Sequence, residues 1–382
     1  MIMDFNLNED HKLIQESARD FANEELAPNA LLWDQDHKFP FEILRQMGDM
    51  GFMGMNLPEH YGGGGVDTIS YCLATMEIGR ADSSIAVTMG VNHLVCEVIN
   101  LYGSDEHKQR YLPILTSGKG IGSFCLSEPQ AGSDAQNQKT RAKQDGDDFV
   151  INGKKAWITN GSFAHVFVVT AVTGEDDRGR KEITAFLVDA DTKGLILGKP
   201  EHKMGQCASN TVEVTFDEVR IPAANMIGGR NGFKVMMNGL NSGRIGVAAM
   251  CCGIGQASFD AALEYSHDRT AFEKPIHQLQ AIQLKLAEMA TELEAAKLLT
   301  LKAAQLKDQG DNFISAASMA KLFASEACNR IAAEAVQIHG GNGYVKEYVV
   351  EKLYRDARVT TIYEGTSEIQ KITIARQFIR KT

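Results

Sequence analysis

The sequence predicts an α+β fold in three consecutive regions, because the spacing of its apolar residues changes twice along the chain. Residues 1–120 show helical spacing, residues 121–230 contain short apolar runs between turns, and residues 231–382 return to helical spacing. With 382 residues, 44% of them hydrophobic, the chain can bury a core large enough for two or three domains. We therefore expect an N-terminal helical domain at 1–120, a middle β-domain at 121–230 and a C-terminal helical domain at 231–382.

The helices are expected where apolar residues recur at helical spacing. In the first region these are residues 10–23 and the more apolar segment 84–101, with the glycine run at 62–65 breaking the pattern between them. In the third region, long helical patterns occupy residues 243–268, 279–308 and 313–339, and Pro275 separates the first two.

The strands of the middle region are expected at 149–153, 166–172, 183–188 and 211–216, which are rich in β-branched and aromatic residues. Asp/Gly turns such as Asp145-Gly146-Asp147 separate such runs. The connections are too short to hold crossover helices, so the sheet is predicted to be antiparallel.

Composition excludes several classes of partner. A net charge of −10 argues against binding to nucleic acid or to an anionic membrane surface. No apolar run approaches the ~20 residues of a membrane span, and the N-terminus has no apolar or Arg-rich leader. The seven cysteines form no C-x-x-C pair, which predicts reduced core thiols, no metal site and a cytoplasmic location.

The segment 360–370, TTIYEGTSEIQ, contains the strongest candidate for catalysis. Ser367 and Gln370 have the spacing of a capping box, with Ser367 as the N-cap of a helix. Glu364 would then lie on a turn beside a helix N-terminus, where backbone N–H groups are free. A carboxylate there could accept a proton while an N–H holds a substrate oxygen, although a solvated turn glutamate is the simpler interpretation.

Unusual residues also gather at the region boundaries, where a ligand between domains would bind. Residues 124–134 read as a strand that ends in a turn with free hydroxyls, and residues 156–161 contain one of only two tryptophans. Trp157 could contact a flat heterocycle or could be a buried core residue. Residues 337–343 end a helix with glycines. These glycines could cap the helix, or they could allow the backbone to approach a ligand closely. No G-x-G-x-x-G follows a strand, which argues against a Rossmann site.

These segments together resemble the acyl-CoA dehydrogenase family along essentially the whole chain. The matching motifs are SEPQAGSDA at 127–135, WITNG at 157–161, RTAFEKPI at 269–276, QIHGGNGY at 337–344 and RDARVTTIYEGTSEIQ at 355–370. The pattern is most similar to short-chain (butyryl) and short branched-chain members. The resemblance implies a C-terminal four-helix bundle, a homotetramer, and one non-covalent FAD in each subunit. It also implies acyl-CoA as substrate and electron-transfer flavoprotein as electron acceptor.

The resemblance also implies roles for single residues, with Glu364 as the base that removes the α-proton of the acyl group. The residues implied to bind FAD are Phe124, Leu126, Ser127, Trp157, Thr159, Arg269, Phe272, Gln280, Gln337, Gly340, Gly341, Thr366 and Glu368. Among them, Arg269, Phe272 and the 337–341 turn would reach the FAD of a neighbouring subunit. Those implied to bind acyl-CoA are Ser133, Asn241, Arg244 and Gly365.

The chain departs from the family pattern at Ala271 and Glu273, where glutamine and glycine are frequent, and at Asn241, where many members have aspartate. The first departure affects the expected FAD contact and the second the expected CoA contact. Position 243, where some members carry the base, is glycine here, so this position offers no alternative to Glu364 as the base.

The expected substrate carries a small apolar acyl group. Residues 84–100 contain no lysine or arginine to hold a distal carboxylate, which argues against glutaryl-type substrates. Ala86, Met89, Gly90 and His93 share a helical face that could meet the acyl tail, or that could be ordinary core. Butyryl-CoA is expected first, and isobutyryl-type or cyclohexanecarbonyl-type thioesters second.

Three alternatives remain open at this point. The same site could run as an enoyl-CoA reductase, because sequence does not encode the direction of the reaction. The chain could be a non-catalytic acyl-CoA-binding homologue, which the intact Glu364 argues against. It could also be an oxidase, although oxidases of the family generally carry an extra C-terminal domain and this chain stops at Thr382.

Overall fold

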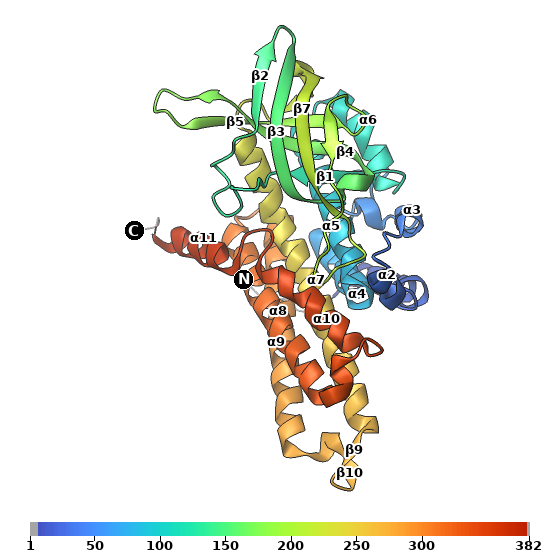
Figure 1. Cartoon of the computed structure of the whole chain (residues 1–382). Helices are drawn as coiled ribbons and strands as arrows, with labels where there is room; N and C mark the ends of the chain where they lie inside the picture. The colour runs from blue at the N-terminus through green and yellow to red at the C-terminus, as the bar shows by residue number, and fades with distance from the viewer. Residues whose placement is uncertain (1–6, 380–382) are drawn as a thin grey trace.

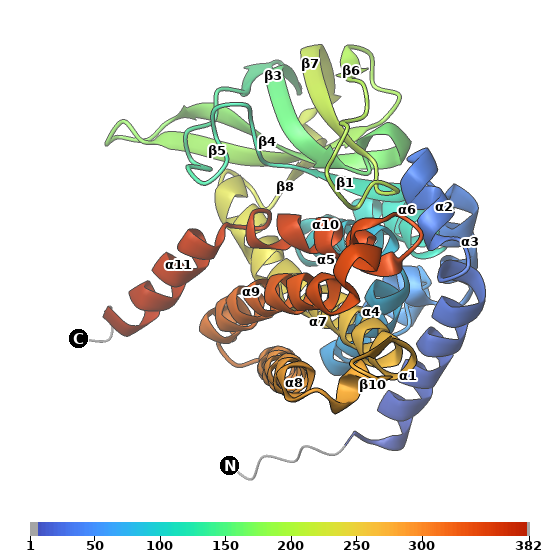
Figure 2. The ribbon, with the colours of Figure 1, turned by 60° about the horizontal axis from the view of Figure 1, so that its bottom comes forward.

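The computed structural model describes residues 7–379 and arranges them as N-terminal helices, a central β-sheet and a C-terminal helical bundle (Figure 1). Figure 2 shows the sheet as a layer above the helices, with α5 and α7 running beneath it. The α+β prediction and its three-part order are confirmed.

The N-terminal helices begin where short polar side chains satisfy free backbone N–H groups. Asn8, Asp67, Asp82 and Ser104 accept hydrogen bonds from the first turns of α1, α4, α5 and α6, respectively. The helices are α1 (Glu9–Phe21), α2 (Ala30–Asp36), α3 (Phe41–Asp49), α4 (Thr68–Ala81), α5 (Ser83–Tyr102) and α6 (Asp105–Thr116). A π-helical turn, Ala22–Leu26, extends α1.

The middle part is an eight-stranded sheet with the order β6-β7-β3-β2-β4-β5-β8, and β1 pairs with β4. Its strands are β1 (Ile121–Cys125), β2 (Arg141–Asp145), β3 (Asp148–Thr159), β4 (Ala164–Glu175), β5 (Lys181–Asp189), β6 (Leu195–Leu197), β7 (Thr211–Pro222) and β8 (Met226–Ile227). The four predicted strand segments lie within β3, β4, β5 and β7.

The prediction of an antiparallel sheet is wrong in one respect, because β4 pairs in parallel with both β1 and β2. The remaining pairs of the large sheet are antiparallel. Parallel pairing arises here without a crossover helix, since the β2–β3 hairpin itself carries the chain from β1 across to β4.

The C-terminal part consists of α7 (Gly232–Asp268), α8 (Gln280–Asp308), α9 (Ile314–His339), α10 (Val349–Arg358) and α11 (Ser367–Ile379). The two-residue strands β9 (Thr270–Ala271) and β10 (Lys274–Pro275) form a hairpin between α7 and α8, at the lower tip of the bundle in Figure 1.

The helix α7 begins at Gly232, well before the predicted residue 243. Its first turns hold glycines and asparagines, which are weak helix formers. Val235 and Met236 nevertheless pack into an apolar cluster with α5 and the sheet, so tertiary burial extends the helix.

Two helices, α5 and α7, are long and apolar enough to cross a membrane by length and composition, contrary to the expectation from sequence. In each, 72% of the most apolar window is buried inside the protein, as in core helices. All seven cysteines are free and buried, as predicted.

Candidate active site

Glu364 lies on a left-handed turn between the end of α10 and the start of α11. Its φ is 51° and that of Gly365 is 92°, so two successive residues adopt a conformation that costs a non-glycine residue about 1 kcal/mol or more. The turn is held by side chains that bind its carbonyl groups. Gln370 Nε2 donates to the carbonyls of Glu364 and Gly365, both at 3.0 Å, and Lys321 Nζ donates to Gly365 at 2.9 Å.

The predicted capping box is wrong in its residues. Thr366, one position earlier than expected, accepts the N-cap hydrogen bond from the Ile369 N–H at 3.3 Å. Ser367 is the first helical residue, and its hydroxyl binds Glu326. Gln370 reaches back as predicted, but to the carbonyls of the turn, and so supports Glu364 directly.

The Glu364 carboxylate packs against α7 at a position where only glycine fits. A Cβ at Gly243 would lie 2.5 Å from Glu364 Oε2 and 3.0 Å from Leu94 of α5. Oε2 is enclosed and has no hydrogen-bond partner within residues 7–379, as expected for an atom that binds a ligand. The absence of a side chain at Gly243 therefore leaves room for the Glu364 carboxylate.

Burial raises the pKa of Glu364 to about 7, while the positive charges of Arg244 and Lys321 lower it. A carboxylate with a pKa near neutrality can both accept and hold a proton at physiological pH. Arg244 is itself buried; its Nη1 donates to Asn241 Oδ1 at 2.8 Å. Its Nε has no partner among the described residues. Asn241 therefore orients Arg244.

The predicted flavin segments meet at the ends of β1 and β3. Ser123 Oγ donates to the Thr159 carbonyl at 2.8 Å, and the Ala156 N–H donates to the Ser127 carbonyl at 3.0 Å. Residues 124–127 and 157–159 therefore lie side by side. Trp157 has a φ of 63° at an irregularity in the β3–β7 pairing and is 65% exposed, so it is not a core tryptophan.

A buried ion pair supports this junction from behind. Lys155 Nζ contacts Glu128 Oε1 at 2.9 Å and also donates to the Leu126 carbonyl at 3.2 Å. Although burial raises it, the Lys155 charge and the Lys139 N–H bring the pKa of Glu128 down to about 2. Glu128 is therefore charged, and its contact with Lys155 helps to fix the loop that follows β1.

The flavin segments and the Glu364 turn face a common apolar cluster. Leu126 and Phe124 pack with Leu94, the residue that also lies against Gly243. From the β-domain, Gln206 Nε2 donates to the hydroxyl of Tyr363, next to Glu364, at 3.3 Å. The structure thus brings together parts of the chain that are more than 200 residues apart in sequence.

Other predicted residues gather at a second place, the far end of the C-terminal bundle. Arg269, Gly340 and Gly341 line a pocket of about 410 Å³ beside the β9–β10 hairpin. Phe272 lies in the turn of that hairpin and is 83% exposed. Gln280 and Gln337 are also exposed, at the start of α8 and near the end of α9. Figure 1 shows this end of the bundle far from the sheet. Within one chain, these residues and the flavin segments therefore do not form a single site.

The remaining predicted residues lie on the surface or in the turn. Ser133 is exposed in the loop between β1 and β2, and Glu368 is exposed in the first turn of α11. Lys321 was not anticipated, because a lysine in an alanine-rich helix gives no signal that it binds a distant carbonyl.

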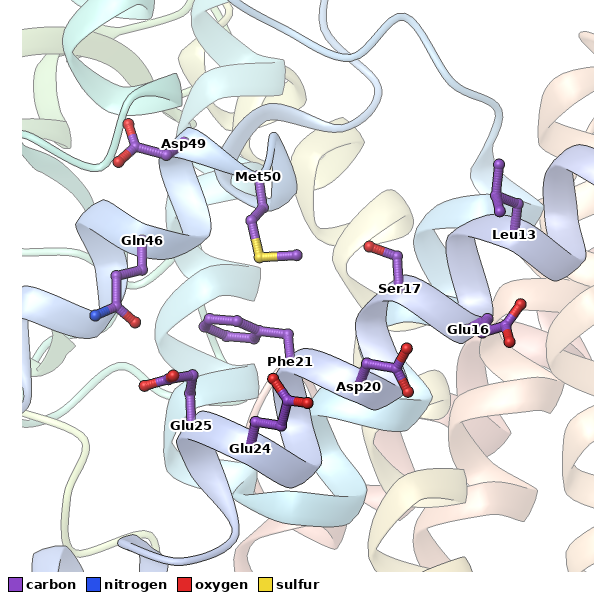
Figure 3. Close-up of a pocket in the computed structure, with 10 residues that line it drawn as sticks. All are labelled: Leu13, Glu16, Ser17, Asp20, Phe21, Glu24, Glu25, Gln46, Asp49 and Met50. Carbon is purple, nitrogen blue, oxygen red and sulfur yellow. The ribbon is translucent and has the colours of Figure 1, made fainter.

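The larger surface hollow, of about 640 Å³, lies elsewhere, between α1 and α3. Figure 3 shows Phe21 and Met50 at its centre, with carboxylates such as Asp20, Glu24 and Asp49 around them. None of the predicted site residues lines it, and it offers no base with an unsatisfied buried oxygen.

Family comparisons agree with this arrangement. Residues 8–119 match the N-terminal domain of acyl-CoA dehydrogenases, residues 123–219 the middle domain, and residues 230–379 the C-terminal domain. The chain belongs to the acyl-CoA dehydrogenase family. It is therefore a flavoprotein oxidoreductase by family, and other members are FAD-dependent.

Two curated relatives have different named activities. The mouse mitochondrial short-chain specific acyl-CoA dehydrogenase is 47% identical and covers 98% of this chain and 91% of its own. The acryloyl-CoA reductase (NADH) of Anaerotignum propionicum is 42% identical, with coverages of 99% and 97%.

Solved structures show the same fold. The butyryl-CoA dehydrogenase of Megasphaera elsdenii has a TM-score of 0.96 at 40% identity and covers 99% of this chain and 100% of its own. A glutaryl-CoA dehydrogenase of Mycobacterium smegmatis, in complex with FADH2, has a TM-score of 0.93 at 34% identity, with coverages of 97% and 95%.

The raised pKa of Glu364 predicts a pH-dependent gain in stability for Glu364→Gln. A carboxyl group whose pKa is higher in the folded state destabilises the fold as pH rises from its ordinary value of 4.5 to about 7. We expect the variant to melt about 2–4 °C above the parent at pH 8 and at the same temperature at pH 4.5–5. Calorimetry at both pH values measures this. Glu347→Gln, at an exposed glutamate outside the site, is the control, and an equal gain there would contradict the assignment.

Proposed function

We propose that the protein catalyses the FAD-dependent α,β-dehydrogenation of a short acyl-CoA to the 2-enoyl-CoA, with Glu364 as the base. The observation that carries this proposal is the enclosed, unpartnered Glu364 Oε2 against Gly243, beside the flavin segments of β1 and β3. Removal of an α-proton and a β-hydride requires a base on one face of the acyl chain and a hydride acceptor on the other, and bound FAD would supply that acceptor.

The residues at the β1–β3 junction suit a flavin ring. Trp157 offers an exposed aromatic face, and the adjoining segments add the apolar side chains of Phe124 and Leu126 and the hydroxyl groups of Ser127 and Thr159. Lys155 and Glu128 would hold this surface rigid. Thr366 and Glu368 are assigned to the ADP side of the cofactor, following the family pattern.

The far pocket suits the diphosphate end of a neighbour's FAD. Arg269 brings a positive charge, and Gly340 and Gly341 allow close approach of the backbone. Phe272, Gln280 and Gln337 complete this assignment. Since this group lies far from Glu364, each FAD would be held by two subunits, which fits the proposed homotetramer.

The acyl-CoA would bind between the turn and α7. The N–H of Glu364 has no acceptor within residues 7–379, so it is free to donate to the thioester carbonyl as negative charge develops there. Such an oriented donor is typically worth about 3–4 kcal/mol in the transition state. Gly365 allows the turn, Arg244 and Asn241 flank the carboxylate, and Ser133 is assigned to the pantetheine and nucleotide arm.

In this arrangement Glu364 Oε2 accepts the α-proton. Bound substrate excludes water from the carboxylate, which raises the proton affinity of Glu364 further. The positive charges of Arg244 and Lys321 act in the opposite direction and favour its ionised form. The protein positions both faces of the acyl chain before reaction, which lowers the entropic barrier.

A butyryl-type acyl group fits best, with isobutyryl-type or cyclohexanecarbonyl-type groups as the alternative. The reverse reaction, reduction of an enoyl-CoA, is a second candidate that the acryloyl-CoA reductase relative favours. A non-catalytic acyl-CoA-binding role would leave the unpartnered carboxylate without a use. Electron-transfer flavoprotein is the proposed acceptor, and the free thiols fit a bacterial cytoplasm.

Replacement of the base tests the core of the proposal. Glu364→Gln should retain FAD and bind butyryl-CoA, yet lose at least two to four orders of magnitude in the rate of flavin bleaching. Anaerobic stopped-flow absorbance measures the rate, and Glu347→Gln, at an exposed glutamate with no assigned role, is the control. A variant that bleaches at more than roughly a tenth of the parent rate would show that another group removes the proton.

Cofactor retention should depend on assembly. Arg269→Ala should lower FAD occupancy, because the charge facing the neighbour's diphosphate is lost, while the fold of each subunit persists. Absorbance ratio and light scattering measure flavin content and mass together. Arg220→Ala, on the β-sheet surface, is the control. A monomer that holds FAD stoichiometrically would contradict the shared site.

The enzyme should discriminate against acyl groups that carry a distal carboxylate. Helix α5 carries no lysine or arginine, and Lys307, which contacts it, is already paired with Glu97 at 2.7 Å. Burial of an unpaired carboxylate costs several kcal/mol, so glutaryl-CoA should be at least ~100-fold worse than butyryl-CoA in kcat/KM. Steady-state assays with both thioesters measure this, and comparable values would overturn the charge argument.

A further inference from the structure

The face of α7 that receives the Glu364 carboxylate continues along the helix with a second glycine. Gly246 follows Gly243 by three residues, so both lie on the same side of α7, separated by a rise of about 4.5 Å. Gly90 of α5 lies opposite, one helical turn from Leu94, the residue that touches Gly243. The space beyond the base is therefore bounded by backbone on two sides.

The hydroxyl of Tyr71 fills this space. A Cβ at Gly246 would lie 2.8 Å from the Tyr71 hydroxyl oxygen, and a Cβ at Gly90 would lie 3.8 Å from it. Tyr71 comes from α4 and is only 4% exposed. No larger residue fits at Gly246 while Tyr71 keeps this position.

Tyr71 is held firmly in place. Its ring stacks on His93 with centroids 4.3 Å apart and planes 21° from parallel. Burial lowers the pKa of His93 to about 4, so this partner is neutral at physiological pH. Burial raises the pKa of the Tyr71 hydroxyl, so this group also stays neutral at physiological pH.

We propose that Tyr71 sets the upper limit on acyl-chain length by closing the space between α5 and α7 one helical turn beyond Glu364. The proposal rests on the proposed acyl-CoA dehydrogenation. A rise of about 4.5 Å accommodates three or four carbons joined by bonds of about 1.5 Å. A butyryl chain then ends at the Tyr71 hydroxyl, and longer chains collide with it. The predicted helix face of α5 contributes through Gly90 and His93, whereas Ala86 and Met89 are buried in the helical core.

Truncation of Tyr71 should therefore lengthen the preferred substrate. Each additional methylene that finds room is worth roughly 10–200-fold in discrimination. Tyr71→Ala should raise the ratio of kcat/KM for hexanoyl-CoA to that for butyryl-CoA by at least tenfold. Tyr71→Phe, which removes the hydroxyl alone, should raise the ratio for pentanoyl-CoA more than that for hexanoyl-CoA. Tyr71→Leu provides a smaller truncation that keeps the core filled if the alanine variant does not fold.

The experiment measures anaerobic flavin bleaching with butyryl-, pentanoyl-, hexanoyl- and octanoyl-CoA on the tetrameric, FAD-loaded enzyme. Leu73→Ala, a buried truncation on another face of α4, is the control and should leave the chain-length ratios unchanged. Unchanged ratios in all folded Tyr71 variants, or an equal change in Leu73→Ala, would overturn the role of Tyr71. The proposed function would instead be overturned if none of these thioesters bleached the flavin of the parent enzyme, or if Glu364→Gln bleached as fast as the parent.

Discussion

One buried carboxylate, Asp356, joins the three parts of the protein on the helix that precedes the Glu364 turn. It accepts hydrogen bonds from Ser83 of the N-terminal helices, from the Gln206 N–H of the β-domain, and from Lys352 of its own helix. An unpaired carboxylate at this depth would cost several kcal/mol, so its partners stabilise the packing of the N-terminal helices and the β-domain against α10. Since α10 precedes the Glu364 turn, the position of the proposed base depends on this contact.

The cost of burying a charged group also controls the protonation of Glu364. Its oxygen is deprived of water but lies near two buried cations, Arg244 and Lys321, whose own pKa values burial lowers. Neither cation donates to the carboxylate; Lys321 binds the turn and Arg244 binds Asn241. Glu364 is therefore stabilised through space and keeps an oxygen free. A direct salt bridge would lower its pKa and occupy the oxygen that, in the proposed reaction, accepts the proton.

Sequence predicted the long helices and four of the strands, because those segments carry strong apolar periodicity. It missed β2, whose residues Arg-Ala-Lys-Gln-Asp show little β propensity and which forms by pairing with β3 and β4. Motifs led us to propose Glu364 and the flavin segments as the site. They could not locate Lys321, Asp356 or Tyr71, since these residues act through contacts with helices distant in sequence, and a buried lysine or tyrosine reads as core until its partners are known.

The glycines of α7 connect these observations. Each costs a helix about 1 kcal/mol relative to alanine, yet Gly243, Gly246 and Gly253 meet the carboxylate, the Tyr71 hydroxyl and the backbone of α4, respectively. A Cβ at Gly253 would lie 2.4 Å from the Met76 carbonyl oxygen, so α4 and α7 touch there without side chains between them. That close crossing is what brings Tyr71, one and a half turns earlier on α4, over Gly246. The helix thus gives up intrinsic stability so that the Glu364 carboxylate, the Tyr71 hydroxyl and the neighbouring helix α4 can all approach its backbone.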